Sequence, residues 1–269
     1  MAETIGFVGL GDLGAPVDGN LLDAGYGLRV WNRTVSKADA LVARGAERAA
    51  TPADAASPGG IVVSLLWDDA SVESVVASDG FLDQLAPGGV HISMSTITPE
   101  ASKRLAALHA ARGSTFVEAP IFGRPEAAAA RQLWIPFAGP AAAKERVRPL
   151  LDAMGAQGVF DFGEEIGAAT MVKLVGNFMI IAMARSIGEG VRAVAANGFD
   201  PKATIEMLTQ TLFDAPIFRS YGRALATGAA APVQSAIPEK DLGLFQRTAA
   251  LAGAPTPISG LLLKIVRAP

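Results

Sequence analysis

A glycine-rich turn near the start of the chain constrains the fold more than any other feature. The apolar residues Ile5–Val8 are predicted to form a short strand, which runs directly into Gly9, Gly11 and Gly14 in the spacing Gly-x-Gly-x-x-Gly. This spacing lets a strand turn tightly into a helix and lets the backbone approach a pyrophosphate at the positive end of that helix. We therefore predict that the chain opens with a dinucleotide site.

The surrounding sequence supplies the context that this motif requires, since a glycine pattern alone is a weak signal. Pro16–Leu22 is predicted to be the helix that follows the turn, and Gly25 and Gly27 can end it. Leu28–Trp31 then has the composition of a second strand. The chain is thus predicted to begin with a strand–helix–strand unit.

The residues after the second predicted strand indicate which nucleotide is bound. Sites for NAD usually place an acid here to hold the ribose 2′-hydroxyl. This chain has Asn32, Arg33 and Thr34 instead, with Lys37 close behind. These side chains can donate hydrogen bonds to a 2′-phosphate, which an acid would repel. NADP is therefore predicted over NAD, the alternative being a turn led by Asn32 with solvated basic side chains.

Composition excludes several other classes of protein. Of the 269 residues, 50% are hydrophobic and 18% charged, with a net charge of -3, so general attraction to nucleic acid or anionic membranes is not expected. The chain has no cysteine and two histidines, so we predict no disulfide and no metal site. Because the apolar segment Ile166–Ala184 contains Lys173 and Asn177, it is predicted to be a buried helix of a soluble, cytoplasmic protein.

The pattern of predicted elements divides the chain into two domains, residues 1–163 and 164–269. In the first, apolar strands alternate with alanine-rich helices, which is typical of an α/β fold with a mostly parallel sheet covered on both faces. In the second, the strand signal disappears. The predicted strands are 4–8, 28–31, 60–65, 90–93, 115–118, 133–138 and 158–162, and the predicted helices are 16–23, 37–43, 52–56, 70–76, 99–112, 141–154, 167–197, 201–212, 215–227 and 240–252.

Lys173 is the strongest candidate for acid–base chemistry. Lys173 and Asn177 are four residues apart on the long predicted helix, so their side chains share one face. The flanking residues are small or apolar, and such surroundings disfavour the charged ammonium and lower its pKa toward the range useful for proton transfer. The alternative is a lysine whose charged end reaches water along an apolar helix.

Two strand ends carry further candidates. Ser95 and Thr96 follow the strand 90–93, at the edge of a doubly wound sheet where ligands bind. Thr98, which precedes Pro99, is predicted to cap the next helix instead. Gly123 and Arg124 follow the strand 115–118 and could bind an anionic group, although Arg124 could equally be a surface charge.

Taken together and in chain order, the motifs of this sequence resemble those of the β-hydroxyacid dehydrogenase family. This family includes 3-hydroxyisobutyrate dehydrogenase and the glyoxylate and succinic semialdehyde reductases. The resemblance extends over essentially the whole chain. Its landmarks are Gly9–Gly14, Trp31–Thr34, Ser93–Thr96, Ala119-Pro120 with Gly123, Gly167–Asn177, and Lys240-Asp241-Leu242.

This resemblance implies a Rossmann-type domain followed by an all-helical domain like that of 6-phosphogluconate dehydrogenase, with the active site in the cleft between them. It implies hydride transfer to or from a nicotinamide, in a homodimer or homotetramer acting on a small molecule. The implied catalytic residues are Lys173 as general acid/base, Asn177, Ser95 and Gly123. The predicted cofactor-binding residues are Gly9, Gly11, Asp12, Leu13, Gly14, Asn32, Arg33, Thr34, Lys37, Leu65, Leu66, Thr96 and Lys240.

The chain departs from the family at the substrate loop. Phe122 and Arg124 stand on either side of Gly123, where the family usually has Ser-Gly-Gly, so the substrate stays open. The first helix is also unusual, because it contains Asp18 and Gly19. Two other functions remain as alternatives. Imine reductases share the architecture but generally lack a lysine at the position of Lys173, and a nucleotide-binding module without turnover would not need Lys173 and Asn177.

Overall fold

A computed structural model describes residues 3–228 and 236–268 of the chain. The described residues form two compact units, one ending at Lys173 and the other beginning at Leu174. The division falls inside a single helix, α9 (Ala168–Ala196), ten residues after the boundary predicted from the sequence.

The first unit is built on a six-stranded, wholly parallel sheet with the strand order β3-β2-β1-β4-β5-β6. Its strands are β1 (Thr4–Val8), β2 (Gly27–Trp31), β3 (Glu47–Arg48), β4 (Ile61–Ser64), β5 (Val90–Ser93) and β6 (Thr115–Glu118). This is the Rossmann order, in which the chain reverses direction across the sheet between β1 and β4. The predicted α/β class is confirmed, and β3 is an edge strand too short for its sequence to signal.

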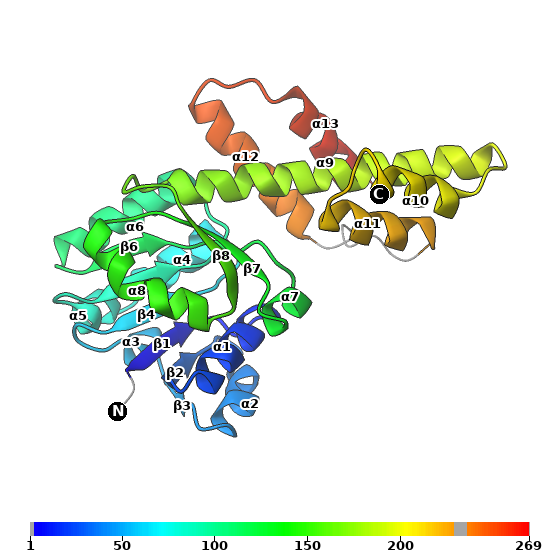
Figure 1. The fold of residues 1–269 in the computed structure, drawn as a ribbon. Coiled ribbons are helices and arrows are strands. Elements are labelled where there is room, and N and C mark those ends of the chain that lie inside the picture. Colours follow the sequence, from blue (N-terminus) through cyan, green and yellow to red (C-terminus); the bar gives the residue numbers. More distant parts are fainter. Residues whose placement is uncertain (1–2, 229–235, 269) are drawn as a thin grey trace. The chain divides into compact units, whose positions relative to one another are not determined.

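Helices cover both faces of this sheet (Figure 1). They are α1 (Gly14–Asp23), α2 (Asp39–Val42), α3 (Pro52–Ala55), α4 (Asp69–Val76), α5 (Phe81–Leu85), α6 (Pro99–Ala111), α7 (Pro125–Ala129) and α8 (Ala141–Ala153), with a 3-10 turn at Val35–Ala38. Alternating strand residues separate two cores. Ile5 and Phe7 pack with α1 and α8, whereas Val8 and Val62 pack with α4 and α6.

A second, two-stranded parallel sheet extends the first unit. It consists of β7 (Leu133–Phe137) and β8 (Ala156–Asp161), and an antiparallel bridge joins Glu118 to Ala138. This pairing connects the end of β6 to the segment after β7. The two-stranded sheet is thereby attached to the edge of the main sheet.

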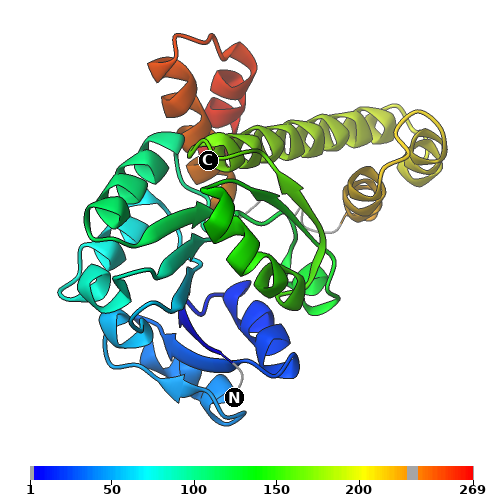
Figure 2. The ribbon, with the colours of Figure 1, turned by 60° about the vertical axis from the view of Figure 1, so that its left-hand side comes forward.

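Among its described residues the second unit contains helices but no strand, as predicted. It contains most of α9 together with α10 (Pro201–Gln210), α11 (Pro216–Ala226), α12 (Ile237–Leu251) and α13 (Pro257–Arg267). Figure 2 shows α10 lying beside α11 and α12 beside α13. Ile181, Leu242 and Leu262 lie at the centre of its apolar core. No predicted helix corresponds to α13, because the last predicted helix ends at residue 252.

The predicted burial of the apolar segment Ile166–Ala184 is only partial, since most of its residues are half-buried rather than buried. By length and composition α9 could cross a membrane, and only 28% of its most apolar stretch is buried. Met179 is 61% exposed. The apolar composition of a helix does not show which part of the protein covers its surface. Among the described residues, the neighbouring helices cover only part of α9.

The two histidines belong to the core of the first unit. His91 Nδ1 lies 3.0 Å from His109 Nε2, and His91 Nε2 lies 2.8 Å from the Ser64 hydroxyl. Burial lowers the pKa of both rings, that of His109 to about 4. Both rings are therefore neutral at pH 7, and they serve the packing of the sheet against α6.

The unusual first helix buries two polar side chains with different outcomes. Asn20 Nδ2 donates to the carbonyls of Ala128 and Met154 at 2.9 and 2.8 Å. Asp18 is fully buried, and neither of its carboxylate oxygens has a hydrogen-bond partner among the described residues. Burial raises the pKa of the Asp18 carboxyl well above its ordinary value.

We expect Asp18→Ala to stabilise the protein at pH 7 by about 1–3 kcal/mol, the usual cost of an unsatisfied buried polar group. Because the folded-state pKa is raised, the unfolded chain loses its proton first as the pH rises above about 4. The contribution of Asp18 to the free energy of unfolding therefore falls as the pH rises, and the difference in stability between Asp18→Ala and wild type grows. Urea unfolding between pH 4 and 8 measures this difference.

Asp18→Asn is the matched control, because it keeps the shape and removes the titration. Its stability should lack the pH-dependent component while retaining the cost of a buried polar group. A gap between wild type and Asp18→Ala that stays constant from pH 4 to 8 would show that Asp18 does not titrate in this range.

Candidate active site

The three glycines of the first turn each meet a different steric demand. Gly9 has φ +107°, and a Cβ there would lie 2.3 Å from the Leu65 carbonyl oxygen. A Cβ on Gly14 would lie 2.3 Å from the Gly9 carbonyl oxygen, whereas one on Gly11 would meet nothing within 4 Å. The first and third glycines thus permit the turn and its close packing, and the second leaves open space beside the backbone. This cradle fits a pyrophosphate at the start of α1.

Asn32 holds the glycine turn in place. Its Oδ1 accepts a hydrogen bond of 2.9 Å from the Leu10 N–H, and its Nδ2 donates to the Thr34 carbonyl at 2.9 Å. The Gly9 N–H also donates to the carbonyl of Trp31 at the end of β2. The Asn32 amide, a predicted contact of the nucleotide, joins the two loops in the structure.

The side chains that follow Asn32 lie at the surface. Arg33, Thr34 and Lys37 are exposed, and Arg33 and Lys37 make no ion pair with the described residues. They come from the loop after β2, whose end is bonded to the glycine turn through Gly9 and Asn32. Two cationic side chains are thus available at the same edge of the sheet as the cradle, where Asp12 and Leu13 also lie.

The loops after β4 and β5 are joined by Ser95. This residue is 1% exposed, and its hydroxyl accepts a 2.8 Å hydrogen bond from the Leu66 N–H. Leu65 and Leu66 also line the glycine turn, since a Cβ on Gly9 would meet the atoms of both. The Ser95 hydroxyl is therefore engaged with the backbone, while Thr96 is partly exposed. The predicted capping role of Thr98 is confirmed, because its side chain accepts from the Ala101 N–H.

The loop after β6 is fixed by its backbone. The Phe122 N–H donates to the Trp134 carbonyl at 2.8 Å, and the Trp134 N–H returns a bond of 2.9 Å. Gly123 has φ +154°, and a Cβ there would lie 2.4 Å from Leu133 Cδ2. Arg124 is exposed and pairs with Glu126 at 3.4 Å.

Lys173 lies in the first unit, 8% exposed, on the second turn of α9. Its Nζ is 4.3 Å from the centroid of the Phe122 ring. The alternative of a lysine reaching into water is therefore wrong for this structure. A buried amine beside an aromatic face is suited to hold a proton and deliver it to a nearby oxygen.

Glu118, at the end of β6, is the important residue that the sequence analysis missed. Its buried carboxylate accepts hydrogen bonds from Gly167 N–H at 3.0 Å, Ala169 N–H at 3.2 Å and Thr170 Oγ at 2.9 Å. It thereby caps the start of α9, where a negative charge complements the helix dipole. Burial raises the pKa of Glu118, and the nearby Ser102 hydroxyl and the donors at the start of α9 lower it in part.

The remaining predicted residues form a polar cluster in the second unit. Asn177 Nδ2 donates to Asp241 Oδ2 at 2.6 Å, and Lys240 Nζ lies 2.8 Å from Asp241 Oδ1. The Asp241 side chain is only 2% exposed. Asp241 thus joins α9 to α12 and engages two residues that the sequence analysis assigned to the active site.

Comparisons with known proteins give the family. Residues 4–176 match the family described as the NAD-binding domain of 6-phosphogluconate dehydrogenase. The chain is 32% identical, over 98% of its length and 91% of the relative, to the NAD-dependent L-serine dehydrogenase of Pseudomonas aeruginosa. It belongs to the β-hydroxyacid dehydrogenase family. The expected class, a nicotinamide-dependent oxidoreductase of the 3-hydroxyacid dehydrogenase type, is confirmed.

Two further comparisons support this dehydrogenase assignment and its fold. The uncharacterized oxidoreductase YfjR of Bacillus subtilis is 42% identical over 93% of this chain and 86% of its own. A solved 3-hydroxyisobutyrate dehydrogenase of Mycobacterium tuberculosis, described with L-serine, has a TM-score of 0.88 at 24% identity, covering 99% of this chain and 93% of that one. The second likeness shows the fold.

Proposed function

We propose that this dehydrogenase is an NADPH-dependent reductase of small semialdehydes, or of the corresponding 3-hydroxyacids in reverse, with Lys173 as general acid/base. The observation that carries the proposal is the burial of the Lys173 ammonium on α9, whose start is bonded to β6 of the nucleotide-binding sheet. A solvent-facing lysine could not perform this role. A cytoplasmic location and a homo-oligomeric state belong to the same proposal.

The choice of NADP rests on the loop after β2. It contains Arg33 and Lys37 but no acid between Trp31 and Ala38. Arg33 is exposed at an edge that Asn32 joins to the glycine turn, and a guanidinium matches a phosphate with two parallel hydrogen bonds. A 2′-phosphate would therefore gain a charge-assisted contact that a 2′-hydroxyl would not.

The chain's own residues would act by alignment and proton transfer. A bound nicotinamide supplies the hydride. The glycine turn and the first turn of α1 would hold the pyrophosphate, and the Leu65–Leu66 loop, fixed by Ser95, would flank the nucleotide. Lys173 would donate a proton from Nζ to the carbonyl oxygen as it becomes an alcohol, and would take it back in the reverse direction. Gly123 and Thr96 would contact the substrate and the cofactor side, respectively.

The decisive experiment measures oxidation of NADPH and NADH with semialdehydes of two to four carbons. We expect turnover with the semialdehydes and a kcat/KM for NADPH that is higher than that for NADH. In Arg33→Ser, kcat/KM for NADPH should fall about 10- to 100-fold, because a charge-assisted hydrogen bond is lost. The value for NADH should change little.

Arg148→Ser is the matched control, since Arg148 is an exposed arginine on α8 paired with Asp152. Equal losses with NADPH and NADH in Arg33→Ser would contradict recognition of a 2′-phosphate. Turnover of cyclic imines alone would favour the imine-reductase alternative, and NADPH binding without any turnover would favour a non-catalytic module. Oxidation of L-serine with NAD but not NADP would refute both the substrate and the cofactor.

A further inference from the structure

The Phe122 ring lies against the Lys173 ammonium. The distance of 4.3 Å from Nζ to the ring centroid lies within the range of a cation–π contact. Both residues belong to the first unit, Phe122 on the loop after β6 and Lys173 on α9.

The position of this ring is set by the backbone on both sides. The antiparallel bridge to Trp134 uses both the N–H and the carbonyl of Phe122. The following residue, Gly123, has a positive φ and packs tightly on Leu133. The Trp134 ring in turn contacts Phe160, with centroids 5.9 Å apart. The N–H and the carbonyl of Phe122 are thus both engaged with Trp134, which fixes the backbone from which the ring projects.

The Lys173 end is fixed as well. Glu118 bonds the first turn of α9, and Lys173 lies three residues beyond Thr170, which Glu118 also contacts. Two elements that are far apart in the sequence thus hold a ring and an ammonium face to face. The carboxylate of Glu118 is committed to the helix start, so the aromatic face is a separate source of attraction for the cation.

We propose that Phe122 is a positioning residue whose ring holds the ammonium of Lys173 in place for proton transfer. This inference rests on the proposed role of Lys173. The negative face of an aromatic ring attracts a partly desolvated ammonium without accepting its proton. The proton therefore stays on Nζ, available to a substrate oxygen, and the flexible lysine stem is restricted to one position. A carboxylate at residue 122 would instead compete with the substrate for that proton.

Phe122→Leu tests the ring, because leucine keeps an apolar side chain and removes the π-system. We expect kcat to fall about 2- to 30-fold, the range that corresponds to a cation–π contact, with the KM for NADPH unchanged. Phe122→Tyr should restore kcat, since it keeps the aromatic face. Phe199→Leu is the matched control, because Phe199 is an exposed ring between α9 and α10. Equal kcat in Phe122→Leu and wild type would overturn the proposal.

A second measurement tests the contact independently of turnover. The lysines are ¹³C-methylated, which preserves their charge, and the Lys173 resonance is assigned by its loss in Lys173→Arg. A ring-current shift is expected in wild type and Phe122→Tyr and should disappear in Phe122→Leu. A Lys173 resonance that is the same in wild type and Phe122→Leu would overturn the proposal. If no substrate were turned over, the proposed function would fail, and the resonance would still decide whether the ring holds the ammonium.

Discussion

Lys173→Ala is expected to lower kcat by about 10²- to 10⁴-fold, the usual contribution of a positioned general acid or base. The variant would retain the glycine turn, the loop after β2 and the Leu65–Leu66 loop, so NADPH should bind with nearly unchanged affinity. The loss should therefore appear in the chemical step. Single-turnover oxidation of NADPH by the semialdehyde found active measures it directly, and fluorescence titration measures the binding.

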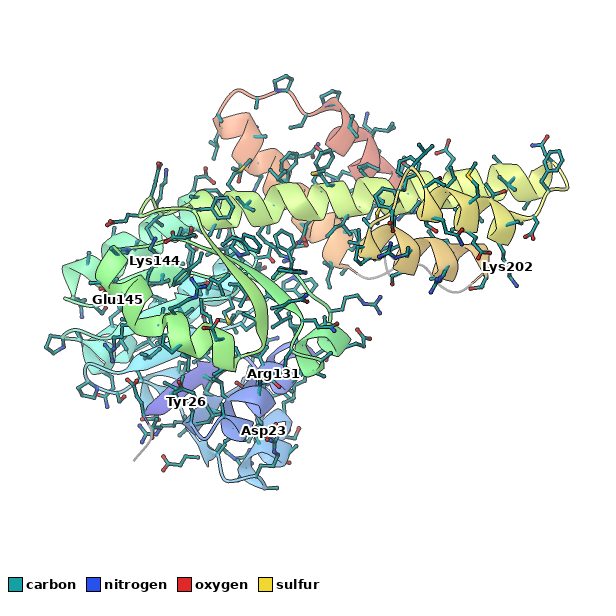
Figure 3. The ribbon with its side chains drawn as sticks, in the orientation of Figure 1. Asp23, Tyr26, Arg131, Lys144, Glu145 and Lys202 are labelled. Atoms are coloured by element: carbon teal, nitrogen blue, oxygen red, sulfur yellow. The ribbon has the colours of Figure 1, made fainter. Side chains whose placement is uncertain are left out.

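Two further variants separate charge from proton transfer. Lys173→Arg keeps a positive charge, but a guanidinium does not release its proton in this pH range, so kcat should stay low. Lys202→Ala is the matched control, because Lys202 is an exposed lysine on α10 (Figure 3). Added methylamine should restore part of the activity of Lys173→Ala. Wild-type kcat in the alanine variant would remove Lys173 from the mechanism.

The features that the sequence predicted well are determined locally. The buried strands β1 and β4 are short, mostly apolar runs bounded by turn residues, and the close approach of Gly14 to Gly9 that the glycine spacing permits lies within the turn itself. Lys173 could be found because a cation in an apolar helical segment is unusual wherever the helix packs. These signals need no knowledge of residues distant in the chain.

The features that the sequence did not predict depend on contacts between distant segments. Glu118 lies 49 residues before Gly167, its first hydrogen-bond partner, and nothing near Glu118 indicates that it caps a helix. Ser95 was predicted to bind the substrate because it is a hydroxyl residue at a strand end. In the structure its hydroxyl accepts a hydrogen bond from the backbone N–H of Leu66, 29 residues away. The ring of Phe122 looked like a departure from the family loop. Only the fold shows that it faces Lys173.

Glu118→Ala is expected to destabilise the protein by roughly 3 kcal/mol or more, because hydrogen bonds to a charged group are lost and two backbone N–H groups stay buried without a partner. It should also lower kcat. Thr170, which Glu118 contacts, is followed one turn later by Lys173, so loosening the helix start displaces the ammonium. Urea unfolding gives the first quantity, and steady-state assays under folding conditions give the second.

The loss of stability expected for each variant at residue 118 depends on the hydrogen-bond donors that face the carboxylate. Glu118→Gln keeps one oxygen, which can still accept from the Gly167 N–H and the Thr170 hydroxyl, but its amide nitrogen would meet the Ala169 N–H. It should therefore lose less stability than Glu118→Ala, and still remove the charge that complements the helix dipole. Glu145→Ala, at an exposed glutamate on α8 (Figure 3), should change neither stability nor kcat. If Glu118→Ala were as stable as Glu145→Ala, the carboxylate would not be what fixes the start of α9, and the position of Lys173 would have to depend on α9 packing alone.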